Sequence, residues 1–136
     1  MHALSMTQLP ALAVLAVVLL LAAVMYAVAR ARGRYGIKAP AITGHPAFEA
    51  IFRVQANTVE SVVMFLPTLW LAARYSNPTL AGALGLLWVL ARAWYAVAYA
   101  RRPASREAPF VVASLLWVVL LVMALVGVIR ALMIAP

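Results

Sequence analysis

The sequence contains no cysteine and only three acidic residues among its 136 positions. Without cysteine, the chain can form no disulfide bond, bind no metal through thiolates and supply no thiol nucleophile of its own. The three carboxylates cannot balance eleven lysines and arginines, and the formal net charge is +8. The two histidines, His2 and His45, are too far apart in the sequence to indicate a metal site.

The chain also has too few polar residues for a water-soluble protein of its length. Hydrophobic residues make up 68% of it and the mean hydropathy is +1.03, whereas ordinary globular domains are about half apolar. A chain of this size cannot bury so much apolar surface in a soluble core. We therefore predict an integral membrane protein. The first apolar run has no basic residue before it and no small-residue cleavage site after it, so we interpret it as a membrane span and not as a signal peptide.

Four apolar runs organise the chain. The first, Leu9 to Ala29, is uncharged, and a helix of that length spans about 30 Å, enough to cross a bilayer. The others run from about Pro46 to Tyr75, Thr79 to Arg101 and Ala108 to Val128. With no internal repeat and short connections, the sequence predicts one all-α domain over residues 1–136, a bundle of four transmembrane helices.

The basic residues gather in the connections between these runs. A segment rich in glycine and proline from Arg30 to Pro46 and a second one from Arg101 to Arg106 together hold seven of them. The positive-inside rule places these two loops in the cytoplasm and both termini outside. We expect a multi-pass protein of a bacterial inner membrane. Because the charges lie in short loops between spans, their pattern argues against nucleic-acid binding.

Polar side chains in the second and third runs indicate a binding site. Arg53, Asn57 and Glu60 are spaced i, i+4 and i+7, so they share one helix face. A carboxylate at the depth of Glu60 is costly unless it has a partner or lines a wet cavity. The topology brings Tyr95 and Tyr99 to the same end of the bundle. We therefore predict that cations, phenols, an amide and a carboxylate meet there.

Each of these residues also has a structural interpretation. Arg53 could anchor a helix end at the interface or join two helices in an intramembrane ion pair. Arg92, deeper in the third run, could simply pair with Glu60. The two tyrosines could belong to an interfacial aromatic belt, and Arg106 could serve only to set the topology.

Two sequence stretches resemble the MAPEG family, the membrane-associated proteins of eicosanoid and glutathione metabolism. The first is FRVQANTVE at residues 52–60, entered through Pro46-x-Phe48-Glu49. The second is LARAWYAVAYARRPASREAP at residues 90–109. The resemblance covers nearly the whole chain. It implies homotrimers of four-helix subunits that hold glutathione between neighbouring subunits near the cytoplasmic face.

The resemblance also implies residue roles. Arg106 would face the thiol as the catalytic residue, because a nearby guanidinium favours the thiolate of a thiol whose pKa is ordinarily about 8.5. The carboxylates and ammonium of glutathione would need arginines and a carboxylate. The implied glutathione-binding residues are Arg32, Arg53, Gln55, Asn57, Glu60, Arg92, Tyr95 and Tyr99.

The implied activity is transfer of glutathione to a lipophilic small molecule or lipid from the membrane, with reduction of lipid hydroperoxides as a second reaction. Two alternatives remain open. One is a non-enzymatic, lipid-binding member of the same family, against which the presence of both Arg53 and Glu60 counts. The other is a small four-helix multidrug exporter. Such exporters carry an essential glutamate in the first helix, and Leu9 to Ala29 contains none.

Overall fold

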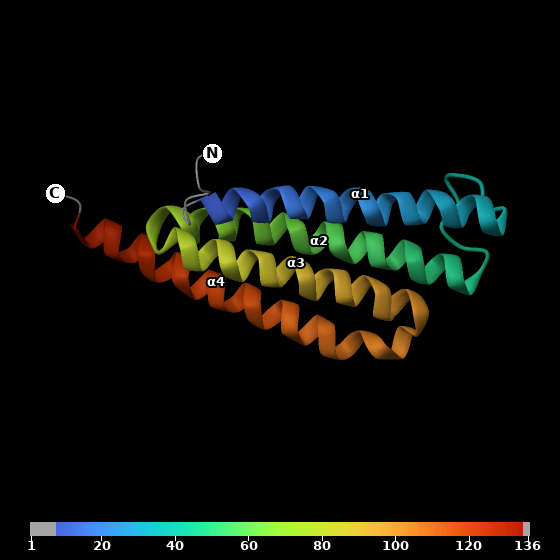
Figure 1. Cartoon of the computed structure of the whole chain (residues 1–136). Helices are drawn as coiled ribbons and strands as arrows, with labels where there is room; N and C mark the ends of the chain where they lie inside the picture. Colours follow the sequence, from blue (N-terminus) through green and yellow to red (C-terminus); the bar gives the residue numbers. More distant parts are fainter. Residues whose placement is uncertain (1–7, 135–136) are drawn as a thin grey trace, which may run out of the picture.

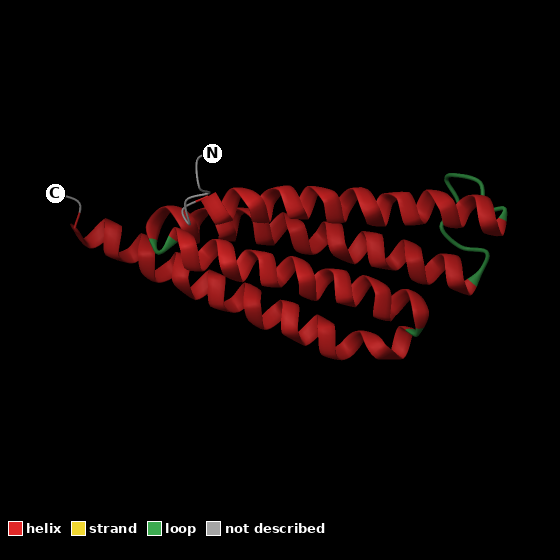
Figure 2. Ribbon diagram, viewed as in Figure 1, coloured by secondary structure: helices red, strands yellow, loops and turns green. Residues whose placement is uncertain are grey.

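Four long helices form the molecule, which a computed structural model describes for residues 8–134. They are α1 (Leu9–Tyr35), α2 (Pro46–Tyr75), α3 (Pro78–Arg101) and α4 (Glu107–Ile134), with a 3-10 turn, Pro103–Arg106, before α4 (Figures 1 and 2). Residues 8–134 contain no strand. All four helical segments are long and apolar enough to cross a membrane. The prediction of an all-α chain with four candidate spans is therefore confirmed.

The helix ends follow from local sequence signals. Before α2, the ring nitrogen Nδ1 of His45 accepts a hydrogen bond from the backbone N–H of Ala47 at 3.2 Å. Before α3, the Asn77 side chain accepts one from the N–H of Leu80 at 2.9 Å. Helix α1 stops at Gly36, whose φ of 66° lies in the left-handed region that glycine adopts most easily. These contacts satisfy backbone groups that the helices leave unpaired at their ends.

Two helices are longer than the apolar runs that predicted them. Helix α1 continues past Ala29 to Tyr35, and α4 continues past Val128 to Ile134. The prediction that a basic loop starts at Arg30 is therefore wrong: three of its arginines lie on the last turns of α1. Arginines there interact favourably with the helix dipole, and their long side chains can reach water from a helix that is still leaving the bilayer.

The helices alternate in direction along one bundle. Helices α2 and α3 pack against each other; α1 and α4 each pack against both of them, from opposite sides (Figure 1). The connection after α1 and the turn after α3 lie at the same end of the bundle, on the right in Figure 1. The two basic segments of the sequence therefore share one end, as predicted.

The interior is held by aromatic stacking and by hydroxyl groups that bond within the bundle. The rings of Phe65 and Trp88 stack with centroids 3.9 Å apart, and Trp117 Nε1 donates to Thr68 Oγ1 at 3.2 Å. Thr68 in turn donates to the Met64 carbonyl one turn earlier. Many large apolar side chains point outward instead, as lipid-facing residues do. The outside of the bundle is therefore suited to a bilayer.

Candidate functional site

A polar cavity of about 410 Å³ opens at the end of the bundle that carries the basic segments. Helix α2, helix α3, the 3-10 turn and the start of α4 all contribute to it. The lining residues are Arg53, Asn57, Tyr95, Arg106, Glu107 and Phe110. The structure thus brings together four residues that the sequence places in one site: two arginines, one amide and one phenol.

Two hydrogen bonds connect the tyrosines of α3 to the other elements of the site. Asn57 Nδ2 donates to the Tyr95 hydroxyl at 2.7 Å, and Arg106 Nη1 donates to the Tyr99 hydroxyl at 3.0 Å. The Arg106 guanidinium also lies 5.1 Å from the centroid of the Tyr99 ring. The rings of Tyr95 and Tyr99 are 5.7 Å apart. Through these contacts α3 fixes the positions of Asn57 and Arg106.

The charges around the cavity favour an anionic ligand. Arg53 and Arg106 bring two guanidinium groups, and Glu107 brings one carboxylate. Guanidinium groups bind carboxylates through paired, charge-assisted hydrogen bonds. The amide of Asn57 and the hydroxyl of Tyr95 add neutral polar groups. The site can therefore hold a small polar molecule with more than one charged end.

A second hollow of about 390 Å³ continues the polar surface toward the first connection. Arg53 lines both hollows, so the two adjoin, and Tyr99, Glu49 and Thr43 also line the second one. The Glu49 carboxylate accepts a hydrogen bond from the backbone N–H of Gly44 at 3.0 Å, which holds the connection against the start of α2. An elongated ligand could extend from Arg106 past Arg53.

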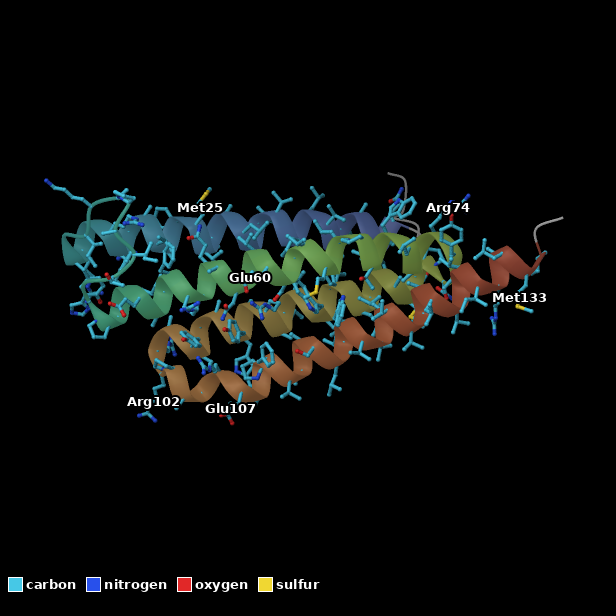
Figure 3. All side chains as sticks on the ribbon, turned by 180° about the vertical axis from the view of Figure 1, so that it is seen from behind. Met25, Glu60, Arg74, Arg102, Glu107 and Met133 are labelled. Atoms are coloured by element: carbon cyan, nitrogen blue, oxygen red, sulfur yellow. The ribbon has the colours of Figure 1, made fainter. Side chains whose placement is uncertain are left out.

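Four of the predicted binding residues line neither hollow within one chain: Arg32, Gln55, Glu60 and Arg92. Arg32 donates to the Ala41 carbonyl at 2.7 Å, and its guanidinium carbon lies 5.0 Å from the Phe48 ring centroid. It therefore stabilises the connection between α1 and α2. Gln55 is half-buried and Glu60 is exposed. Figure 3 shows Glu60 partway along α2 and apart from the cavity residue Glu107. A helix rises about 10 Å over the seven residues from Arg53 to Glu60, which explains the separation.

Arg92 lies behind the cavity, fully inside the bundle. Only 2% of its surface is exposed, Nη2 donates to Thr58 Oγ1 at 3.1 Å, and its guanidinium carbon is 4.2 Å from the Tyr95 ring centroid. The interpretation that Arg92 pairs with Glu60 is wrong. Residues two apart on a helix point about 200° apart, and α2 turns Thr58 toward α3 and Glu60 outward.

Sequence reasoning missed three residues of this region. Glu107 and Phe110 line the cavity, and Thr58 holds Arg92. Glu107 could have been found from the sequence, because it is one of only three acidic residues and lies directly after Arg106. Phe110 is one apolar residue in an apolar run and carries no such signal.

The histidines have separate places in the chain. The His45 ring stacks on Tyr35 at 4.1 Å between centroids, while His2 lies outside the described residues. Among residues 8–134, no group of three potential metal ligands gathers.

The fold and the site define a class of protein: a bundle of four helices of membrane-spanning length, with a positively charged cavity at its basic end. Residues 10–126 match the model of the MAPEG family. The chain belongs to the MAPEG family, which confirms the resemblance seen in the sequence motifs. Family and helices together make it an integral, multi-pass membrane protein.

Relatives of several kinds are similar to this chain. An uncharacterized protein of Synechocystis is 45% identical over 101 residues, which cover 74% of each chain. Microsomal glutathione S-transferase 2 of Bos taurus is 36% identical over 104 residues, covering 76% of this chain and 71% of the relative. Leukotriene C4 synthase of Cavia porcellus is 38% identical over 114 residues, covering 79% and 76%.

Proposed function

We propose that this protein is a membrane-embedded glutathione transferase that joins the glutathione thiolate to lipophilic electrophiles. The observation that carries the proposal is the convergence of Arg53, Asn57, Tyr95 and Arg106 on one cavity of about 410 Å³. That volume falls within the ~300–1,000 Å³ of typical small-molecule sites. Relatives named as glutathione S-transferase and leukotriene C4 synthase support the same function.

The proposed chemistry rests on the two arginines. Arg53 would bind a glutathione carboxylate, with Asn57 and Tyr95 orienting the peptide. Arg106 would lie beside the sulfur, where its charge favours the thiolate; each unit by which it lowers the thiol pKa corresponds to about 1.4 kcal/mol. The thiolate then attacks the electrophilic carbon and forms a carbon–sulfur bond. The bond from that carbon to the leaving group breaks, and its electron pair goes with the leaving group. The hydrogen bond from Arg106 to Tyr99 holds the guanidinium in place before the reaction.

We propose a homotrimer because one chain leaves part of the predicted site incomplete. Arg32, Gln55 and Glu60 reach glutathione only if a second copy brings them to it. Glu60 is exposed on α2 between Val59 and Val63, which are 46% and 67% exposed. A carboxylate beside lipid-facing valines is costly, and a subunit interface would cover it. The mass of the purified protein in detergent, measured by light scattering, tests this assembly.

The proposed location follows from the charge distribution. The connections after α1 and α3 would face the cytoplasm of a bacterium and both termini would lie outside its inner membrane. Glutathione would then reach the cavity from the cytosol, and the electrophile would come from the bilayer. Detoxification of lipophilic compounds, including reduction of lipid hydroperoxides, is the role that this arrangement suits.

Arg53→Gln should weaken glutathione binding by about tenfold or more, because a charge-assisted hydrogen bond to a carboxylate is lost. Isothermal titration calorimetry of the detergent-purified protein measures the affinity, and conjugation of a generic aromatic electrophile measures the activity. Arg130→Gln is the matched control, since Arg130 is exposed near the end of α4. A wild-type protein that binds fatty-acid probes but no glutathione would replace our proposal with the lipid-binding alternative.

Tyr95→Phe should lower glutathione affinity by about five- to tenfold and protein stability by ~1 kcal/mol, because the Asn57 amide loses its hydroxyl partner. The aromatic ring, and with it the contact to Arg92, is kept. Tyr26→Phe serves as the control, since that side chain is 67% exposed on α1. Equal behaviour of the two variants in calorimetry and thermal unfolding would show that the Asn57–Tyr95 bond contributes nothing to the site.

A further inference from the structure

A smaller cavity of about 180 Å³ lies directly behind the glutathione cavity, further from the basic end of the bundle. On α2 its lining includes Ser61, beyond Asn57; on α3 it includes Arg92, before Tyr95; and on α4 it includes Ser114, beyond Phe110. Trp88 and Trp117 complete largely apolar walls. This inner cavity therefore combines one cation and two hydroxyl groups with a lining suited to a lipophilic molecule.

Arg92 reaches this inner cavity without a counter-charge. It is 2% exposed, its Nη2 donates only to the neutral Thr58 hydroxyl, and its Nε has no hydrogen-bond partner within residues 8–134. The rings of Tyr95 and Trp88, with centroids at 4.2 and 6.0 Å, add the weak negative potential of their faces. Burial of a cation normally requires a charged partner. A ligand that develops negative charge on oxygen would supply one.

The two cavities adjoin closely enough to hold two parts of one reaction. Phe110 lines both of them. Tyr95 lines the outer cavity while its ring packs against Arg92, and Ser61 in the inner cavity donates to the Asn57 carbonyl at 2.7 Å. A thiolate in the outer cavity and an oxygen atom bound by Arg92 would therefore lie on either side of Phe110.

We propose that the inner cavity binds the carbonyl oxygen of an apolar α,β-unsaturated ketone or aldehyde, and that Arg92 is a catalytic residue for its conjugation. This proposal rests on the glutathione transferase function above. A neutral carbonyl can enter from the bilayer without losing the hydration of a charge, which a carboxylate or phosphate would have to lose. Arg92 then interacts most strongly with the charge that forms during the reaction, which is the condition for catalysis.

The reaction balances without a further reactant. The thiolate sulfur forms a bond to the β-carbon, the carbon–carbon π pair shifts toward the carbonyl carbon, and the carbonyl π pair moves to oxygen. The resulting enolate oxygen carries the negative charge beside Arg92. A proton from water then adds to the α-carbon and restores the carbonyl, giving the conjugate and hydroxide, which is neutralised by the proton released when the thiolate formed.

The test compares two electrophiles in detergent-purified protein: a long-chain enone, and benzyl chloride, which has no oxygen. Arg92→Met should reduce kcat/KM for the enone by about 100-fold, the size of effect seen on removing one oxyanion donor, and by less than about tenfold for benzyl chloride. Arg101→Met is the control, since Arg101 is exposed on the same helix, and it should leave the ratio of the two constants unchanged. Equal losses on both electrophiles after Arg92→Met would overturn the proposal.

A second variant decides the matter if Arg92→Met does not fold. Ser114 is half-buried at the inner cavity, and Ser114→Leu places an apolar side chain in that space at a position where a membrane helix tolerates it. It should lower enone conjugation relative to benzyl chloride conjugation by about tenfold. Inhibition by the saturated ketone, which cannot accept the thiol, should weaken in the same variant; unchanged inhibition and an unchanged ratio would overturn the proposal.

Wild-type activity on benzyl chloride without activity on the enone would overturn the proposal too, whereas inactivity on both would refute the transferase function itself.

Discussion

Arg106→Ala should reduce turnover by about 10²- to 10³-fold while glutathione binding stays within roughly threefold of the wild type. In the proposed mechanism the guanidinium stabilises the thiolate, which is the reactive form, whereas Arg53 and the other residues of the cavity would still bind the peptide. Ultraviolet absorbance of the bound thiolate measures the ionisation directly, and stopped-flow conjugation measures the chemical step. The two signals should fall together.

Arg102→Ala is the matched control for that variant. Arg102 lies at the start of the same turn, is exposed, and does not line the cavity. Arg106→Lys should fall between alanine and the wild type, because lysine keeps the charge but cannot stack on the Tyr99 ring as the planar guanidinium does. Normal turnover in Arg106→Ala would remove the catalytic role assigned to this residue.

The local chain explains why Arg106 is held so well. It ends the 3-10 turn that begins at Pro103, and α4 starts with the next residue. Its guanidinium donates a hydrogen bond to the hydroxyl of Tyr99, which lies seven residues earlier on the last turns of α3. The position of Arg106 is therefore fixed by a short turn between two long helices, and small changes in that turn would move it.

The helices could be predicted from the sequence because their signals are local. Apolar runs give the spans, and His45 and Asn77 mark the starts of α2 and α3 through contacts with near neighbours. The C-terminal end of α1 could not be placed in this way. The apolar run ends before Arg30, but the helix continues to Tyr35. The reason is that the backbone hydrogen bonds of a helix do not depend on whether its side chains are apolar.

The site could be predicted only where its geometry follows from helix periodicity. The i, i+4 spacing of Arg53 and Asn57 and the antiparallel topology placed them beside Tyr95. The partner of Arg92 depended instead on how α2 is rotated about its axis. A rotation that buries Thr58 must expose Glu60, and the choice between them is made by packing of α2 against α3, which a single helix sequence does not specify.

Leucine in place of Gly82 should destabilise the folded protein by ~3 kcal/mol or more. A Cβ at this position would overlap the backbone of Leu9 and Pro10, so no change of side-chain rotamer can relieve the clash between α3 and α1. Alanine at Gly82 should already cost about 1–3 kcal/mol for the same reason. Thermal unfolding in detergent, followed by circular dichroism, measures both losses.

Gly33→Ala separates this packing effect from the ordinary cost of changing a glycine. Gly33 lies within α1, and a Cβ there would meet nothing within 4 Å, so alanine should be neutral or stabilise the helix by ~0.5–1 kcal/mol. Gly82 lies near the start of α3, at the end of the bundle opposite the cavity, so Gly82→Ala should keep its glutathione affinity at temperatures where it is folded. If Gly82→Ala and Gly33→Ala unfolded at the same temperature, the close contact of α1 with α3 would not be what holds these helices together.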